Sequence, residues 1–176
     1  MIKLKLKNKR ADGVFGLSFS MIFSIILIVF FIVTAFVAIK FFLGWQKKVM
    51  IGTFFDSLES KVKEALNSGS ADMTKKYSLP DGVKDVCFID LNRPKLDANT
   101  DEKNIYDDVF SHGGVNNFKN NVYIYAPNTD YGLSWKTIKN INTTAKNPTC
   151  VPVKNGIVSL RIQRKPEGYS VYVSAA

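Results

Sequence analysis

The chain has 176 residues and a formal net charge of +9, a length that allows one modest globular domain beside a membrane segment. Five of the 24 basic residues stand within the first ten positions, and residues 41–176 carry only 18 basic against 14 acidic side chains. Those charges form no basic stripe and no stacked-aromatic recognition motif, so composition and pattern argue against a nucleic-acid partner.

A short basic leader, residues 1–13, precedes a long apolar run. Between Val14 and Ile39, eighteen side chains are Phe, Ile, Leu or Val, and none is charged. A helix of about 20 apolar residues crosses the hydrocarbon layer of a bilayer, whereas a cleaved secretory signal has an apolar region of roughly 7 to 15 residues. The sequence therefore predicts a transmembrane helix over residues 14–46, anchoring the chain in a lipid bilayer.

Flanking charges predict the orientation of this helix. Five basic residues precede it, and three follow at Lys40, Lys47 and Lys48. Because the more basic flank stays in the cytoplasm, we expect a cytoplasmic N-terminus and an extracytoplasmic C-terminal domain in the cell membrane. Trp45 would then lie at the outer interface, where aromatic side chains are enriched.

Small residues recur on one face of the predicted span. They are Gly16, Ser20, Ser24, Ala35 and Ala38, and helical spacing places them in nearly one direction. Small side chains allow membrane helices to approach closely, so this face is a candidate for helix packing and self-association. The alternative is that Gly, Ser and Ala are simply common in membrane helices.

An amphipathic helix is predicted over residues 47–67, continuing the span without a proline. Its apolar positions recur at intervals of three and four: Ile51, Phe54, Phe55, Leu58, Val62, Ala65 and Leu66. The pattern indicates one helix of about 50 residues, weakest at Gly44 and Gly52. Asn and Gly in "NSGSAD", residues 67–72, supply a left-handed cap that ends it.

The head domain, residues 70–176, is predicted to be rich in strands. Four segments rich in Val, Ile, Phe and Tyr read as strands, at 83–91, 121–126, 156–164 and 168–175, the last two forming a terminal hairpin. Residues 92–120 and 127–155 are expected to be long surface loops. The predicted fold is α+β, with a long N-terminal helix packed on a small antiparallel sheet.

Cys87 and Cys150 are predicted to form a disulfide in the extracytoplasmic head. Closing a loop of about 63 residues would stabilise the fold by roughly 4 kcal/mol in the chain-entropy model. Two free, buried cysteines are the alternative. Without a nearby histidine, the pair cannot complete a zinc site.

Two further patterns concern ligands and modification. Asp97, Asn99, Asp101 and Asp108 occupy the first, third, fifth and twelfth positions of a calcium-loop pattern. Glu102 stands where the sharp turn of such a loop calls for glycine, so a solvated acidic loop is the favoured interpretation and calcium the alternative. Asn142 begins an N-x-T glycosylation pattern, which is short enough to arise by chance.

Catalytic motifs are missing from the sequence. His112 is the only histidine and follows Ser111 directly, an adjacency that does not bring a nucleophile and base face to face. No phosphate loop, metal triad or nucleophile elbow is present. We expect neither an enzyme nor a cofactor.

The basic leader, the span continued as an amphipathic helix, and the small β-rich head together resemble type IV pilins and pilin-like proteins. The run "SFSMIFSIILIVFFIVTAFVAIKFF" after the leader most resembles archaeal pilin-like or anchored cell-surface proteins. The resemblance covers residues 9 to about 66, whereas the head matches only in being β-rich.

The resemblance implies that a membrane peptidase cuts the leader and that the exposed helices then pack into a filament core. Cleavage would fall between Gly13 and Val14 or, as the alternative, after Gly16. The first site puts Ser18 at the fifth mature position, where bacterial pilins carry glutamate; many archaeal pilins lack that glutamate as well.

Three interpretations of function follow. The first is a pilin-like structural or surface-assembly subunit, with other pilin-like subunits as partners. The second is an uncleaved anchor that holds a ligand-binding or accessory domain and has no filament role. The third is an anchored enzyme. Fold-level likeness transfers function poorly, so the state of the N-terminus is the observation that separates the first two.

Overall fold

The computed structural model describes residues 19–69, 71–90, 93–95, 100–113, 121–127, 129, 135–143, 146–164, 166 and 168–176. The chain divides into two compact units, Met1–Leu43 and Gly44–Ala176. Helix α1 (Phe19–Asn67) has 49 residues and contributes to both units. The predicted leader and its cleavage points at Gly13, Val14 and Gly16 lie outside the described residues.

In the first unit, the described residues are the apolar part of α1. Phe30 and Phe36 expose 61% and 65% of their surface, and none of the most apolar stretch is buried in the structure. Among the described residues, α1 is the one helix long and apolar enough to cross a membrane. Exposed apolar surface of this extent is typical of a membrane-spanning or interaction segment.

In the second unit, α1 buries the predicted apolar stripe. Six of the seven predicted positions are almost completely buried: Ile51, Phe54, Phe55, Leu58, Val62 and Ala65, while Leu66 is partly buried. Gly69, just beyond the end of the helix, has a φ of 74°. The backbone N–H of Ser68 donates to the Glu64 carbonyl at 3.1 Å. The predicted left-handed cap is therefore present.

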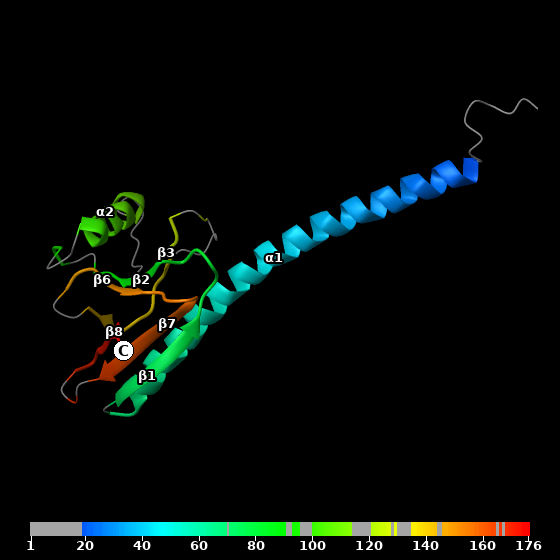
Figure 1. The fold of residues 1–176 in the computed structure, drawn as a ribbon. Coiled ribbons are helices and arrows are strands. Elements are labelled where there is room, and N and C mark those ends of the chain that lie inside the picture. The colour runs from blue at the N-terminus through cyan, green and yellow to red at the C-terminus, as the bar shows by residue number, and fades with distance from the viewer. Residues whose placement is uncertain are drawn as a thin grey trace, which may run out of the picture. The chain divides into compact units, whose positions relative to one another are not determined.

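One four-stranded sheet has the order β1-β7-β8-β5. Its strands are β1 (Ala71–Ser78), β7 (Ile157–Arg164), β8 (Val171–Ala175) and β5 (Ile141–Asn142). β7 pairs antiparallel with β1 and β8, which confirms the predicted terminal hairpin, whereas β5 pairs parallel with β8. In Figure 1, β1 and β7 lie beside the C-terminal part of α1. β1 was not predicted.

A second sheet has the order β4-β3-β2-β6, so the prediction of a single sheet is wrong. Its strands are β2 (Asp85–Phe88), β3 (Val122–Tyr125), β4 (Trp135–Lys136) and β6 (Thr149–Pro152), all paired antiparallel. One face of this sheet contributes Val86, Phe88, Val122, Ile124 and Val151 to the main core, which also contains the α1 stripe and the inner face of the first sheet.

The opposite face of the second sheet is covered by α2 (Thr100–Gly113), as Figure 1 shows. Ile105, Tyr106 and Val109 form a second apolar cluster with Cys87 and Ile89. The prediction that residues 92–120 form a loop is therefore wrong for this segment. Helical spacing brings the three apolar residues onto one face, and their burial against the sheet stabilises the helix. The mainly polar composition of the segment is the reason that a loop was predicted.

Candidate functional site

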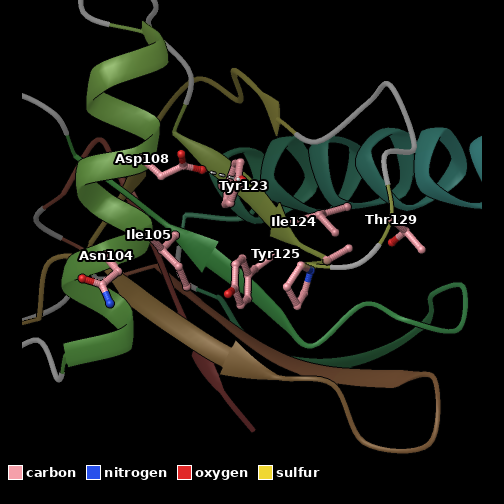
Figure 2. Close-up of a pocket in the computed structure, with 9 residues that line it drawn as sticks. Asn104, Ile105, Asp108, Tyr123, Ile124, Tyr125 and Thr129 are labelled. Carbon is pink, nitrogen blue, oxygen red and sulfur yellow. Dashed lines mark hydrogen bonds between the residues drawn. The ribbon is translucent and has the colours of Figure 1, made fainter.

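A cavity of about 570 Å³ lies between α2 and β3 (Figure 2). Its walls come from α2, from β3 and from the segment that follows β3. The lining residues are Asn104, Ile105 and Asp108, then Tyr123, Ile124 and Tyr125, then Ala126, Pro127 and Thr129. This volume falls within the range of small-molecule binding pockets, about 300–1,000 Å³. We take this cavity as the candidate functional site.

The alternation of β3 supplies the aromatic wall. Val122 and Ile124 are buried in the main core. Successive side chains of a strand point to opposite faces, so Tyr123 and Tyr125 both project toward α2. They pack against the second apolar cluster and remain partly accessible.

From α2, the cavity receives Asn104, Ile105 and Asp108, which helical spacing brings onto the side facing β3. Figure 2 shows the Asp108 carboxylate directed at the Tyr123 hydroxyl, which donates a hydrogen bond to Oδ2 at 3.4 Å. This contact ties the helix to the strand at one end of the cavity. Asp108 itself is exposed.

The environment of Tyr123 keeps its phenol protonated. Burial, followed by the charge of Asp108, raises the pKa of Tyr123 to about 12. The hydroxyl is consequently a hydrogen-bond donor at neutral pH and has no use as a general base. Trp135 lies opposite Tyr123 in the β3–β4 register, and the two rings stack with centroids 6.1 Å apart and planes 14° from parallel.

Several acidic groups lie on the α2 side of the second sheet. None of the described residues that line the cavity is basic. Burial raises the pKa of Asp85, and the nearby charges of Glu102 and Asp101 raise it further, while Lys84 opposes them. Lys103 of α2 and Lys95, which pairs with Asp107 at 2.5 Å, add positive charge on the same side, so charges of both signs lie beyond the cavity lining.

The disulfide lies in the strands beside Tyr123 of the cavity wall. Cys87 of β2 and Cys150 of β6 are paired in register and bonded, with their Cα atoms 4.0 Å apart. Cys87 is also the register partner of Tyr123. The predicted disulfide is confirmed, although Cys150 lies in a strand and not in the predicted loop. Because the bond joins two neighbouring strands, it holds the sheet together beneath α2.

The calcium-loop residues are not brought together by the described structure. Asp97 and Asn99 lie outside the described residues, while Asp101 and Asp108 both belong to α2. Seven residues of helix separate these two by about 10 Å along the axis, too far for both carboxylates to reach one cation at about 2.4 Å. Among the described residues, no group of three His, Cys, Asp or Glu side chains could hold a metal ion.

The other predicted positions lie elsewhere in the chain. Asn142 is in β5, opposite Tyr172, and not in the predicted loop. Ser111 and His112 lie in α2, where the Ser111 hydroxyl donates to the Asp108 carbonyl at 2.9 Å. Ser24 donates its hydroxyl to the Ser20 carbonyl at 2.8 Å, within α1.

The remaining small residues of the predicted packing face, Ala35 and Ala38, also lie in α1 and are exposed, whereas Gly16 is outside the described residues. All the described members of this face belong to the first unit. The structure therefore leaves the face accessible to a neighbouring helix.

A smaller groove of about 400 Å³ lies between α1 and residues 137–140. Ion pairs join the charged groups around it. Lys63 contacts Glu59 at 2.8 Å, and Lys136 contacts Glu59 at 3.1 Å and Asp56 at 2.7 Å. We interpret this groove as part of the attachment between α1 and β4.

Comparison of the chain with protein-family models, with curated proteins and with solved structures finds no match. The function therefore has to be argued from the residues and the geometry.

The sequence contained a signal for this cavity. In "NVYIYA" two tyrosines alternate with Val and Ile, so the face opposite the core carries large aromatic side chains that need a cover. In "TDEKNIYDDVFSHG" Ile, Tyr and Val recur at helical spacing. Together the two patterns could have predicted a helix packed over β3.

Proposed function

We propose that the chain is a single-pass, membrane-anchored protein with an extracytoplasmic head, acting as a pilin-like structural or surface-assembly subunit. The observation that carries this proposal is the difference in burial between the two parts of α1. The same helix exposes its apolar side chains in the first unit and buries an apolar stripe in the core of the second. A helix that is apolar all round fits lipid or a bundle of like helices.

Orientation and compartment support the proposal. The basic leader favours a cytoplasmic N-terminus. The Cys87–Cys150 disulfide fits an oxidising compartment outside the cytoplasm. In an assembled state, neighbouring copies would pack through the small residues of α1, and a leader peptidase would first remove residues 1–13.

Mass spectrometry of the mature N-terminus, on protein purified from its membrane, tests the proposal. A chain that begins at Val14 is expected; a chain that begins just after Gly16 would place the cut at the alternative site. An intact Met1 would contradict processing and favour a plain anchor.

A second candidate is an uncleaved anchor that presents a ligand-binding or accessory domain. The cavity between α2 and β3 favours it, since it is open, partly aromatic and carries polar groups. The two candidates differ in the first unit and share the same head, so a bound ligand alone would not choose between them.

A further inference from the structure

We infer that the cavity between α2 and β3 binds an organic cation, either an alkylammonium or a guanidinium group. This inference goes beyond the proposed subunit role and holds whether or not the leader is removed. It rests on the charge, the aromatic content and the polar groups of the cavity.

The charge of the described lining disfavours anions as ligands. Among the described lining residues, Asp108 alone is charged. A phosphate, sulfate or carboxylate would meet this carboxylate and find no Lys or Arg partner on the described walls. Beyond the lining, Asp85, Asp101 and Glu102 add negative charge on the same side of the sheet. Lys84 offsets part of that charge, so the main attraction on a cation comes from the Asp108 carboxylate of the lining itself.

The aromatic wall selects for a cation with apolar substituents. Tyr123 and Tyr125 line the cavity from one strand, and Trp135 stacks against the Tyr123 ring. The face of an aromatic ring attracts ammonium and guanidinium groups within about 6 Å of its centroid. The combination of rings and a carboxylate is the chemistry that recognises such groups, because the rings replace the water that the cation loses.

The remaining walls fit the rest of such a ligand. Ile105 and Pro127 provide apolar surface for methyl or methylene groups. The Asn104 amide oxygen and the Thr129 hydroxyl can accept hydrogen bonds from an N–H donor. Thr129 is held at the rim by a turn in which its backbone N–H donates to the Ala126 carbonyl at 3.1 Å, and Figure 2 shows it across the cavity from α2.

The test is isothermal titration calorimetry of the full chain in micelles of a non-ionic detergent, which carries no ammonium group of its own. The cationic probes are choline and a lysine with both backbone ends blocked. Glucose serves as the neutral probe and sulfate as the anionic probe. We expect saturable binding of both cations that weakens with added salt, and no binding of glucose or sulfate. Saturable binding of glucose or sulfate, or no binding of either cation by the folded protein, would overturn the inference.

A matched pair of variants separates site binding from general charge. Asp108→Asn removes the charge in the cavity and keeps an oxygen for the Tyr123 hydroxyl, so we expect affinity for the cations to fall roughly tenfold. Asp107→Asn changes the net charge equally but alters a residue outside the lining, which pairs with Lys95 at 2.5 Å. That variant should bind as the parent does. Equal weakening in both variants would contradict a site in the cavity.

Substitution of the aromatic wall gives a second readout. Tyr125→Phe keeps the ring and should retain binding, whereas Tyr125→Leu removes the ring and should weaken binding of choline several-fold. Far-ultraviolet circular dichroism and the intact disulfide verify that both variants are folded. Choline affinity that is the same in the folded Phe and Leu variants would contradict the role of the ring.

Discussion

The buried ring and the buried hydroxyl of Tyr77 have opposite effects on the stability of the fold. The side chain is 6% exposed, and its ring packs edge-on against Phe54 with centroids 5.3 Å apart. Among the described residues, its hydroxyl is the one buried side-chain polar atom without a hydrogen-bond partner. Burial raises the pKa of Tyr77 to about 12. The ring therefore stabilises the core while the hydroxyl opposes folding.

Tyr77 predicts a loss of stability at high pH. The folded pKa of about 12 lies above the reference value of 10.0, so the contribution of Tyr77 to the free energy of unfolding is constant below pH 10. It falls as the pH rises from 10 to 12, because the unfolded chain releases the proton first. For two pKa units the loss is about 2–3 kcal/mol. Urea unfolding of the full chain in detergent micelles, at a series of pH values, measures it.

Tyr77→Phe should reduce this alkaline loss and leave stability at pH 7 unchanged or raised by up to about 1 kcal/mol. Some loss should remain, because the pKa of Tyr123 is raised to about 12 as well. Tyr169→Phe is the matched control, since Tyr169 is 90% exposed. If Tyr77→Phe and Tyr169→Phe have the same pH profile as the parent, the buried phenol is not responsible.

The disulfide beside the candidate site could be predicted from single residues, whereas the cavity could not. Cys87 and Cys150 could be paired from the sequence because the chain has two cysteines and a predicted extracytoplasmic location. The cavity could not be assigned in the same way. Its carboxylate and its tyrosines stand 15 positions apart or more in the sequence, and only the packing of α2 on β3 brings them together.

Elements with a strong periodic pattern were predictable, and elements stabilised by their neighbours were not. The α1 stripe and the β7–β8 hairpin follow the spacing of apolar residues. By contrast, β1 has one buried side chain, Tyr77. Its exposed Lys75 and Lys76 break the apolar alternation expected of a strand, and the strand depends on pairing with β7 over eight positions. α2 was missed because its buried residues are diluted by Asp, Glu, Lys and Asn.

Two glycines in and beyond α1 provide a test of element stability. Gly52 lies within the helix and Gly69 just after it, and an added Cβ would meet no atom within 4 Å at either position. They differ in backbone conformation, because Gly69 has a φ of 74°. Gly52→Ala should stabilise the protein by about 0.5–1 kcal/mol through helix propensity. Gly69→Ala should destabilise it by about 1 kcal/mol, since a Cβ is strained in the left-handed region.

The pair is compared by urea unfolding of the full chain, each variant serving as the control for the other. Opposite shifts of the midpoint at an unchanged slope are the expected result. Shifts of the same sign would show that the added methyl acts by some route other than backbone conformation.

At the scale of the whole molecule, the two parts of α1 have residue patterns suited to two different environments. Its first-unit residues are exposed and mostly apolar, while its second-unit residues divide into a buried stripe and a charged side. The sequence predicted this change of pattern, because charges return only after Ile39 and then avoid the stripe. What surrounds the first unit lies outside the single chain, and experiments on assembly can identify it.

Assembly through the small face of α1 can be tested at Ser20 and Ser24. Because the Ser24 hydroxyl already donates to the Ser20 carbonyl within the helix, we expect small size, and not hydrogen bonding between helices, to be the feature that matters. Ser20→Ala with Ser24→Ala should therefore retain assembly, while Ser20→Leu with Ser24→Leu should abolish most of it by holding the helices apart.

Crosslinking in native membranes, followed by gel electrophoresis, measures the fraction of assembled chains. Val29→Leu with Phe36→Leu places the same leucines on the opposite side of the helix, as 100° per residue requires, and should leave assembly intact. Assembly retained in the Ser-to-Leu variant would contradict packing through this face. Assembly lost equally in the Ala and Leu variants would instead assign the contact to the hydroxyls.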